Sequence, residues 1–570
     1  MRVTGTCLLV VGLGLLLACG GGGGGGEDDA GTAPDGAMDA GMDAPMADAG
    51  PLWRACEETE PAGTSSLPFV PSTLVATIAP MEASLAEPGE LNPVTLEGEL
   101  AYAAMGFGEY AAGPGQPRVQ RTDLGGETAF GARRSLTFFT HLADSQLVDD
   151  ESPARIANLD SPEGSGAIRA QEAYVPRALS AMARTLGQVE EAARPLDFGV
   201  VSGDCTDNGQ LNELRWFIDT LDGRTVDYDS GEDDDPLPGP DNDPKDPFDA
   251  VAFPAPWLFV PGNHDVEVVG IFPPTMAQID RALGTRATLG ARDYRRPHGA
   301  ITRGTVPADP MRLPLQREEI VAELRDSPAT PGPVGHGYPE DADLTHGASY
   351  VYDAVPGLLR IVGFDTNDLT GGSIGMVLRS TVEEWLEPAL AQAEEDGVLV
   401  ILASHHSTLE IDTVEGEAGD VREDAVPGAE LEAIVAAHPQ VIAWMVGHEH
   451  FNRVRAIPGA EGTPGYWEIM TSSLVDWPQQ MRLMELVDNG NGTLSLFATL
   501  LDYATESCME RRYRRLGLME FQSGWGDSYS DDPNDLNVEL VVPTPASAAD
   551  AVAAASAGAR IESLTSLAGE

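Results

Sequence analysis

Basic side chains are scarce in this chain of 570 residues, which has 34 Lys and Arg against 91 Asp and Glu. Lys245 is the single lysine, so almost all of the positive charge is arginine. We interpret this, together with the abundant Ala and Gly, as a compositional bias. The formal net charge of −57 argues against a nucleic-acid partner, because proteins that bind phosphate backbones present basic surfaces.

Long apolar runs are also missing. The run from Cys7 to Leu17 is too short to span a bilayer comfortably, and its pattern is that of a secretory signal peptide, which we assign to residues 1–18. Its end, LLAC, resembles a bacterial lipobox, which implies that Cys19 is lipidated after cleavage. Gly20 then favours the outer membrane, so we expect an exported protein with a lipid anchor in the bacterial cell envelope. The alternative is an ordinary signal peptide with an incidental cysteine.

Cysteine is rare as well, with five in the chain. Cys7 leaves with the signal peptide and Cys19 is assigned to the lipid, so three remain in an oxidising setting. Cys56 and Cys508 could join the two ends of the folded region, whereas Cys205 lies inside a candidate metal motif and is expected to be a small buried thiol. The sequence leaves open whether the disulfide forms.

Composition divides the rest of the chain into four segments. Residues 19–52 are rich in Gly, Ala and Asp, which predicts a flexible acidic tether. Residues 53–130 are expected to be an N-terminal extension packed on the main domain at 131–510, and residues 511–570 a peripheral tail. The acidic insertion at 227–249 lacks the EF-hand spacing, so we expect a solvated loop and not a calcium site.

Five apolar runs in the main domain have the length of buried strands: SLTFFTHL, DFGVV, PWLFV, GVLVILA and QVIAWMV. Amphipathic helices are predicted between them at 166–192, 212–221 and 379–395, where apolar residues recur every three or four positions. Strands that alternate with helices indicate an α/β fold. Ligands of such sheets bind beyond the carboxyl ends of the strands, so the residues that follow these runs are the candidate site.

The first two runs end in LADSQL and SGDCTDN. Asp144 and Gln146 are two residues apart and therefore share a strand face, whereas His141 lies on the opposite face and is expected to be structural. Asp204 follows a glycine turn and could bridge two cations with its two oxygens. For Asp207 or Asn208 we favour the capping of the helix that follows or of the turn before it.

The other three runs end in PGNHD, SHHS and GHEH, which hold five of the ten histidines. Asn263 offers a carbonyl oxygen, His264 an imidazole that titrates near neutral pH, and Asp265 a carboxylate that could orient this imidazole. The two imidazoles of GHEH, His448 and His450, are one residue apart and can contact adjacent metals. Oxygen and imidazole donors without thiolate suit Mn, Fe or Zn.

The order and spacing of these motifs over residues 134–503 resemble the calcineurin-like metallophosphoesterase superfamily. The pattern of that superfamily runs DxH, GDxxD or GDxxxN, GNH, a middle His, and GHxH. This chain resembles a bacterial branch with Gln in place of the His of DxH. The resemblance implies a four-layer αββα sandwich of two mixed β-sheets flanked by helices.

The resemblance also implies two metal ions with Asp204 as the bridge. The first ion would be held by Asp144, Asp204 and His450, and the second by Asp204, Asn263, His405 and His448. His405 is preferred to His406 because the middle ligand of the family is usually the first of such a pair. Gln146 is the departure: a neutral amide oxygen is a weaker donor than imidazole, which leaves the occupancy and identity of the first metal open.

The implied function is the hydrolysis of small phosphomonoesters, phosphodiesters or phospholipid head groups by attack of a metal-bridging hydroxide. His264 would protonate the leaving oxygen, with Asp265 as its orienting partner. Gln146 and the lack of a legible specificity motif support an alternative, a catalytically weak surface-binding lipoprotein that retains the fold. A nuclease of the same superfamily is disfavoured, because the acidic surface would repel a polyanion.

Overall fold

The computed structural model describes residue 56 and residues 66–81 and 91–559, with gaps at 127, 163–165, 233–234, 294–299, 369, 412–421, 423, 461 and 527–528. These residues belong to the unit Gly50–Glu570. No helix within them is both long enough and apolar enough to cross a membrane. The predicted signal peptide, Cys19 and the tether lie outside the described residues.

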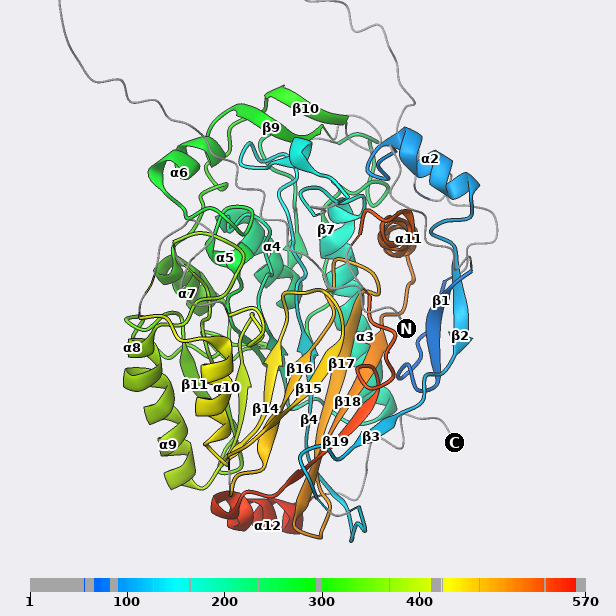
Figure 1. The fold of residues 1–570 in the computed structure, drawn as a ribbon. Coiled ribbons are helices and arrows are strands. Elements are labelled where there is room, and N and C mark those ends of the chain that lie inside the picture. The colour runs from blue at the N-terminus through cyan, green and yellow to red at the C-terminus, as the bar shows by residue number, and fades with distance from the viewer. Residues whose placement is uncertain are drawn as a thin grey trace, which may run out of the picture. The chain divides into compact units, whose positions relative to one another are not determined.

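The larger of two main sheets has seven strands (Figure 1). Their spatial order is β3 (Val119–Arg121), β19 (Val538–Pro543), β18 (Thr493–Asp502), β17 (Gln480–Asp488), β4 (Arg134–Leu142), β5 (Phe198–Val201) and β8 (Trp257–Phe259). Strands β4, β5 and β8 run parallel, and β17 pairs antiparallel with both β4 and β18. The sheet is therefore mixed.

The second main sheet has six strands. Their order is β11 (Tyr350–Val355), β12 (Leu359–Gly363), β13 (Leu399–Ala403), β14 (Val441–Val446), β16 (Gly465–Met470) and β15 (Arg453–Pro458). The four central strands are parallel and the two edge strands antiparallel. All five strands predicted from the apolar runs are present, as β4, β5, β8, β13 and β14.

Alternation along β13 shows how the sheets are layered. Leu399, Ile401 and Ala403 belong to a core cluster that also contains residues of the seven-stranded sheet. Val400 and Leu402 face the other way and pack with α9 (Glu387–Asp396) and α10 (Gly428–Ala436). Successive side chains of a strand point to opposite faces, so β13 is buried on both.

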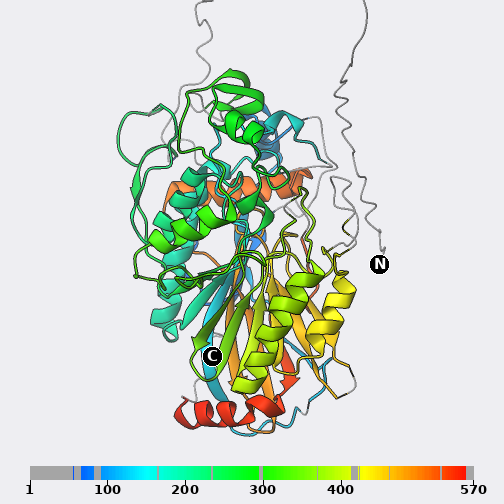
Figure 2. The ribbon, with the colours of Figure 1, turned by 90° about the vertical axis from the view of Figure 1, so that its left-hand side faces the viewer.

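On the other side of the paired sheets, α3 (Val175–Ala192) and α4 (Leu211–Leu221) pack against the seven-stranded sheet through the shared core cluster. Figure 2 shows these two helices on one side of the sheets and α9 and α10 on the other. The predicted four-layer αββα sandwich of two mixed sheets is confirmed.

Helix α3 begins later than predicted. The pattern predicted a helix from residue 166, but residues before Val175 form only a short 3-10 turn, η2 (Glu172–Tyr174). Pro176 lies in the first turn of α3, where its missing N–H is tolerated; further along a helix, a proline breaks the hydrogen-bond pattern. The residues before Val175 are therefore outside α3, and some of them lie at the candidate site.

The remaining described elements are short or lie at the periphery. They are β1 (Ala76–Pro80), α2 (Leu96–Ala104), β2 (Tyr110–Pro114), η1 (Ala157–Leu159), β6 (Thr225–Val226), β7 (Phe248–Asp249), α5 (Asn263–Val266), α6 (Met276–Ala282), β9 (Arg286–Asp293), β10 (Ala300–Thr305), α7 (Arg317–Asp326), α8 (Arg379–Thr381), η3 (Val382–Leu386), η4 (Ala546–Ala548) and α12 (Ala549–Gly558).

The C-terminal segment is not peripheral, which corrects the prediction for residues 511–570. Strand β19 lies inside the seven-stranded sheet, between β18 and β3, and α11 (Cys508–Ser523) is largely buried. The β-branched run in β19 is a strand signal that the acidic and Ala-rich surroundings concealed. The structure also pairs Cys56 with Cys508 and leaves Cys205 as a buried free thiol.

Part of the acidic insertion is buried, which corrects the prediction of a solvated loop at 227–249. The only lysine of the chain, Lys245, is 4% exposed, and its Nζ lies 3.0 Å from Asp229, 3.1 Å from Glu151 and 3.4 Å from Asp150. A buried ammonium needs carboxylate partners, because desolvation of an unpaired charge is strongly unfavourable. This ion-pair cluster fixes the insertion to the segment that follows β4.

Candidate metal centre

Five strands bring the predicted ligands to one edge of the sandwich. Asp144 follows β4, Asp204 follows β5 and Asn263 follows β8, while His405 follows β13 and His448 follows β14. Within each sheet these strands are parallel, so their carboxyl ends lie at the same edge. The convergence that the sequence predicted is therefore produced by the strand directions.

The backbone at this edge adopts an unfavourable conformation. Nine non-glycine residues in the described part of the chain have a positive φ, and five of them are Asp144 (53°), Gln146 (40°), Asp204 (51°), His448 (78°) and His450 (58°). Residues with a Cβ rarely occupy the left-handed region, and such strain concentrates at functional sites. The positive φ alone therefore distinguishes these five predicted positions from most other non-glycine residues.

The carboxylates of Asp144 and Asp204 lie among imidazoles. His405 Nε2 is 3.1 Å from Asp204 Oδ2 and 3.9 Å from Asp144 Oδ1, and His450 Nε2 is 3.5 Å from the same Asp144 oxygen. Asp144, Asp204 and His405 form a group whose donor atoms lie within 4.8 Å of one another. Both Asp144 oxygens accept a hydrogen bond of 3.1 Å from the His448 N–H, which ties the two sheets together here.

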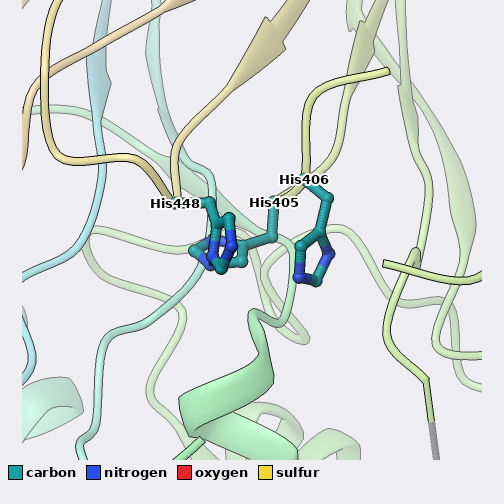
Figure 3. Close-up of side chains that lie close together, drawn as sticks. All are labelled: His405, His406 and His448. Atoms are coloured by element: carbon teal, nitrogen blue, oxygen red, sulfur yellow. Dashed lines mark hydrogen bonds between the residues drawn. The ribbon is translucent and has the colours of Figure 1, made fainter. Parts of the chain in front are cut away.

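His405 and His406, the two histidines after β13, lie close to His448 (Figure 3), but they have different hydrogen-bond partners. His405 Nδ1 donates to the Ser202 carbonyl at 2.8 Å, which directs Nε2 toward Asp204 and to within 3.2 Å of His448 Nδ1. This is the usual arrangement of an imidazole that ligates a metal. His406 has both nitrogens engaged, with Thr366 Oγ1 and the Ser373 carbonyl at 3.0 Å each. His406 also groups with His405 and His448 within 4.8 Å, so the choice of His405 as the ligand stays a prediction.

Two of the predicted ligands, Asn263 and Gln146, have a buried amide oxygen without a hydrogen-bond partner among the described residues, as do several other Asn and Gln side chains. Asn263 Nδ2 donates to the Gly270 carbonyl at 2.9 Å, and its Oδ1 is unsatisfied. Gln146 Nε2 lies 3.4 Å from Asp204 Oδ2, and its Oε1 is likewise unsatisfied. An isolated buried acceptor is unfavourable, whereas a cation would satisfy it. The donor set therefore fits metal ions, including at Gln146.

His264 is held by Asp207, which corrects the role predicted for Asp265. Its Nδ1 donates to the Asp207 carbonyl at 2.8 Å and lies 3.4 Å from Asp207 Oδ1. Burial disfavours the charged imidazole, but the negative charge of Asp204 and the hydrogen bond with Asp207 outweigh it and raise the pKa of His264 to about 9. The His264 side chain is 20% exposed, whereas that of His405 is fully buried.

The carboxylate of Asp265 is occupied by the backbone. It accepts from the N–H groups of Cys205 at 2.9 Å, Thr206 at 3.0 Å and Gly262 at 2.8 Å. A carboxylate at the start of a short helix binds free N–H groups more readily than the imidazole next to it in sequence. Asp265 therefore fixes the loop that carries Asp204 and is a positioning residue.

Asp207 and Asn208 do not cap α4, contrary to prediction. The N-terminal cap is Gln210, with Glu213 completing a capping box. Asn208 Nδ2 donates to Glu213 Oε1 at 2.6 Å, which supports that box from outside. The turn is longer than the sequence suggested, and this places Asp207 beside His264.

Two residues of the site escaped the sequence analysis. His450 Nδ1 donates to Asp476 Oδ2 at 2.7 Å, and Arg169 Nε donates to both Asp476 oxygens at 2.9 and 3.1 Å. Arg169 Nη1 also lies 3.8 Å from Asp207 Oδ1. Asp476 follows β16 in a loop without a recognisable motif, and Arg169 lies in the segment that was predicted to be helical. No sequence signal identified Asp476. For Arg169 the signal was Pro176, which marks the first turn of α3 and so places Arg169 before the helix.

Asp476→Asn is expected to weaken metal binding by about 10- to 100-fold, because it removes the carboxylate that orients His450 and supports its basicity. Metal content measured against increasing chelator concentration would show the loss. Asp149→Asn is the matched control, because Asp149 is also buried and accepts from an arginine, Arg312 Nε, at 2.8 Å, but does not line the cavity. Equal metal affinity in the two variants, at equal loss of thermal stability, would contradict the orienting role.

Several of the residues of the site line one cavity of about 420 Å³. Its wall includes Gln146, Arg169, Asp204, Asp207, Asn263, His264, His448 and His450. His141 is not part of it: this residue is fully buried and contacts Ser202 Oγ at 2.8 Å and Thr471 Oγ1 at 2.6 Å. The predicted structural role of His141 is confirmed.

The chain was compared with known proteins. No protein-family model and no curated protein matches its sequence. Among solved structures it is similar to a dimetal phosphatase from Danio rerio, with 11% identity, a TM-score of 0.34, and coverage of 65% of this chain and 99% of that one. A purple acid phosphatase from yellow lupin (Lupinus luteus) seeds matches at 11% identity and a TM-score of 0.27, covering 68% of this chain and 54% of the other. Similarity at this level assigns no activity to the chain.

Proposed function

We propose that this chain is a metal-dependent phosphoesterase of the calcineurin-like metallophosphoesterase superfamily. The convergence of the six assigned ligands carries the proposal: four of them line one cavity, Asp144 and His405 group with Asp204, and Asn263 has an orphaned amide oxygen. Left-handed backbone at four of these six residues supports it. Sites of this donor chemistry suit hydrolysis at phosphorus.

Asp144, Asp204 and His450 would hold one ion, and Asp204, Asn263, His405 and His448 the other. Two bound cations would activate water and stabilise the charge that develops on the phosphoryl group. Gln146 Oε1 is buried and unsatisfied, so it is available to the first ion as a neutral oxygen donor. Mn, Fe and Zn are all compatible with these donors.

Side chains of the protein would donate the proton and bind the phosphoryl group. His264 is positioned to give a proton to the leaving oxygen, because Asp207 holds Nδ1 and the partly exposed ring lines the cavity. Arg169 lines the same cavity and would attract the anionic phosphoryl group. Asp476 and Asp207 on either side of its guanidinium group hold it in place.

A small-molecule phosphate ester is the proposed substrate, whether a monoester or a diester. The net charge of −57 disfavours nucleic acid as a substrate, since like charges repel. We also propose that the protein is exported and anchored to the outer membrane by a lipid at Cys19. Palmitate labelling and globomycin sensitivity test the anchor, and an unlabelled soluble mature protein would reject it.

The decisive experiment combines metal analysis with hydrolysis. The purified protein, loaded with Mn, Fe or Zn, is expected to hydrolyse an aryl phosphate or a bis-aryl phosphate, and His448→Ala is expected to lose both the activity and one metal. The relative rates on the two esters separate a monoesterase from a diesterase. If the wild type binds the metals but is inactive under every loading, the proposed phosphoesterase activity is contradicted.

That outcome would favour the second candidate, a surface lipoprotein that keeps the fold for binding. The specific observation behind it is Gln146, where the amide is a weaker donor than the imidazole usual in the family. Binding of inorganic phosphate by the metal-loaded but inactive protein would support this candidate.

A further inference from the structure

Part of the cavity wall is apolar. Ile156, Val269 and Ile271 line it together with Ala167, whereas most of the remaining wall is charged or polar. None of these four side chains can donate or accept a hydrogen bond. A hydroxyl-rich group placed against them would lose its contacts with water and receive nothing in return.

This apolar wall, formed by Ile156, Val269 and Ile271, is preformed. Val268 and Phe272 exchange two backbone hydrogen bonds of 2.8 and 3.1 Å, and the Ile271 carbonyl accepts from Gly372 at 2.9 Å. Behind the wall, Val269 packs in a small buried cluster with Ile156 at its edge. Rigid apolar surface of this kind is what small-molecule sites use to bind the non-reacting part of a ligand.

The apolar wall adjoins the proposed proton donor. Gly270, with a φ of 65°, packs on the imidazole of His264 so closely that a Cβ there would lie 2.3 Å from Cδ2 and 2.4 Å from Nε2. Gly270 also accepts from Asn263 at 2.9 Å. The leaving oxygen must lie within reach of His264, so the group attached to that oxygen is the part of the substrate nearest to the wall.

Beyond the cavity the apolar character continues along the chain. Ile271, which lines the cavity, is 37% exposed, and Phe272 and Met276, which follow it in the sequence, are 36% and 70% exposed. Isolated exposed apolar residues are ordinary, but a series that begins inside a polar cavity extends its apolar side outward.

We propose that the substrates are phosphate esters whose leaving alcohol carries an alkyl or aryl group, which lies against Ile156, Val269 and Ile271. This inference rests on the proposed function and specifies its substrate class. In the reaction, water supplies a hydroxyl to phosphorus, the P–O bond of the ester breaks, and the alcohol leaves with a proton from His264. The water's second proton is left with the phosphate product or the solvent, and His264 is then reprotonated.

Straight-chain alkyl phosphates from ethyl to octyl test the apolar wall, because their leaving alcohols have similar acidity. In the metal-loaded protein kcat/KM is expected to rise about two- to fourfold for each added methylene until the wall is covered, the upper value being about that of a fully buried methylene. Ile271→Ser is expected to flatten the rise and Ile271→Leu to retain it. Val334→Ser is the matched control, because Val334 is 50% exposed and does not line the cavity.

Non-hydrolysable alkylphosphonates, titrated calorimetrically, give a second measurement that does not require turnover. Their affinity is expected to increase with chain length in the wild type and much less in Ile271→Ser. Hydrolysis of all members of the series with equal kcat/KM, or a preference for a sugar phosphate, would overturn the inference. The proposed function would remain supported. If no ester is hydrolysed, the proposed function fails, and phosphonate affinity that is independent of chain length would then reject the apolar wall as well.

Discussion

Asp204→Asn is expected to abolish phosphoesterase activity, with a loss of about a thousandfold or more. Asp204 is the residue assigned to both ions: its Oδ2 lies 3.1 Å from His405 Nε2, and its carboxylate groups with Asp144 within 4.8 Å. An amide has one oxygen and no charge, so it cannot bridge two cations. Metal catalysis contributes several kcal/mol to such reactions, and each 1.36 kcal/mol corresponds to about a factor of ten in rate.

The same substitution should release metal, so metal content and activity are measured on the same preparation. The fold is expected to survive, because the amide oxygen of the substituted side chain can still accept the 2.8 Å hydrogen bond that the His264 N–H donates to Asp204 Oδ1. Asp222→Asn is the matched control, because Asp222 has a fully buried side chain that accepts from Ser327 at 3.0 Å but lies outside the cavity wall. An Asp204→Asn protein that keeps two metals and its activity would contradict the bridging assignment.

His264→Ala is expected to lower kcat by about 100- to 10,000-fold, the usual contribution of a general acid, while metal content stays unchanged. His264 is the histidine in the cavity wall that is not assigned to a metal, and its ring is held through Nδ1 by Asp207. A proton donor matters most when the leaving group is a poor one. The loss should therefore be largest for alkyl phosphates and smallest for an activated aryl phosphate.

That dependence on the leaving group separates an acid from a merely structural residue. A structural role would reduce the rates of all esters by the same factor. His346→Ala serves as the control, because His346 lies outside the cavity wall and its Nε2 is 3.6 Å from Glu384. Equal losses on all esters, or a loss of metal equal to that of His448→Ala, would remove His264 from proton transfer.

The site shows where sequence reasoning succeeds. Apolar runs ending in Asp144, Asp204, Asn263, His405 and His448 were sufficient to place these residues at strand ends, because strand length and burial leave a clear local pattern. The preference for His405 over His406 came from the resemblance and stays a prediction; in the structure both nitrogens of His406 are engaged by Thr366 and Ser373.

Partnerships between side chains were predicted less well. Asp265 was expected to hold its neighbour His264, but backbone N–H groups occupy its carboxylate, and Asp207 holds the imidazole from another strand end. Adjacency in the sequence did not predict this contact, because the side chains of neighbouring residues at the start of a helix point in different directions. Arg169 was concealed in a helical pattern that Pro176 interrupts.

By itself, the sequence of this protein determined the strands, the alternation of strand and helix, and the residue types gathered at the strand ends. These features depend on hydrophobic periodicity and on local turns, which are determined by residues that are close together in the sequence. Only the tertiary structure decided that Asp476 orients His450, that β19 enters the main sheet, and that the apolar wall adjoins His264. Each of these depends on contacts between segments far apart in the chain, whose packing no local pattern records.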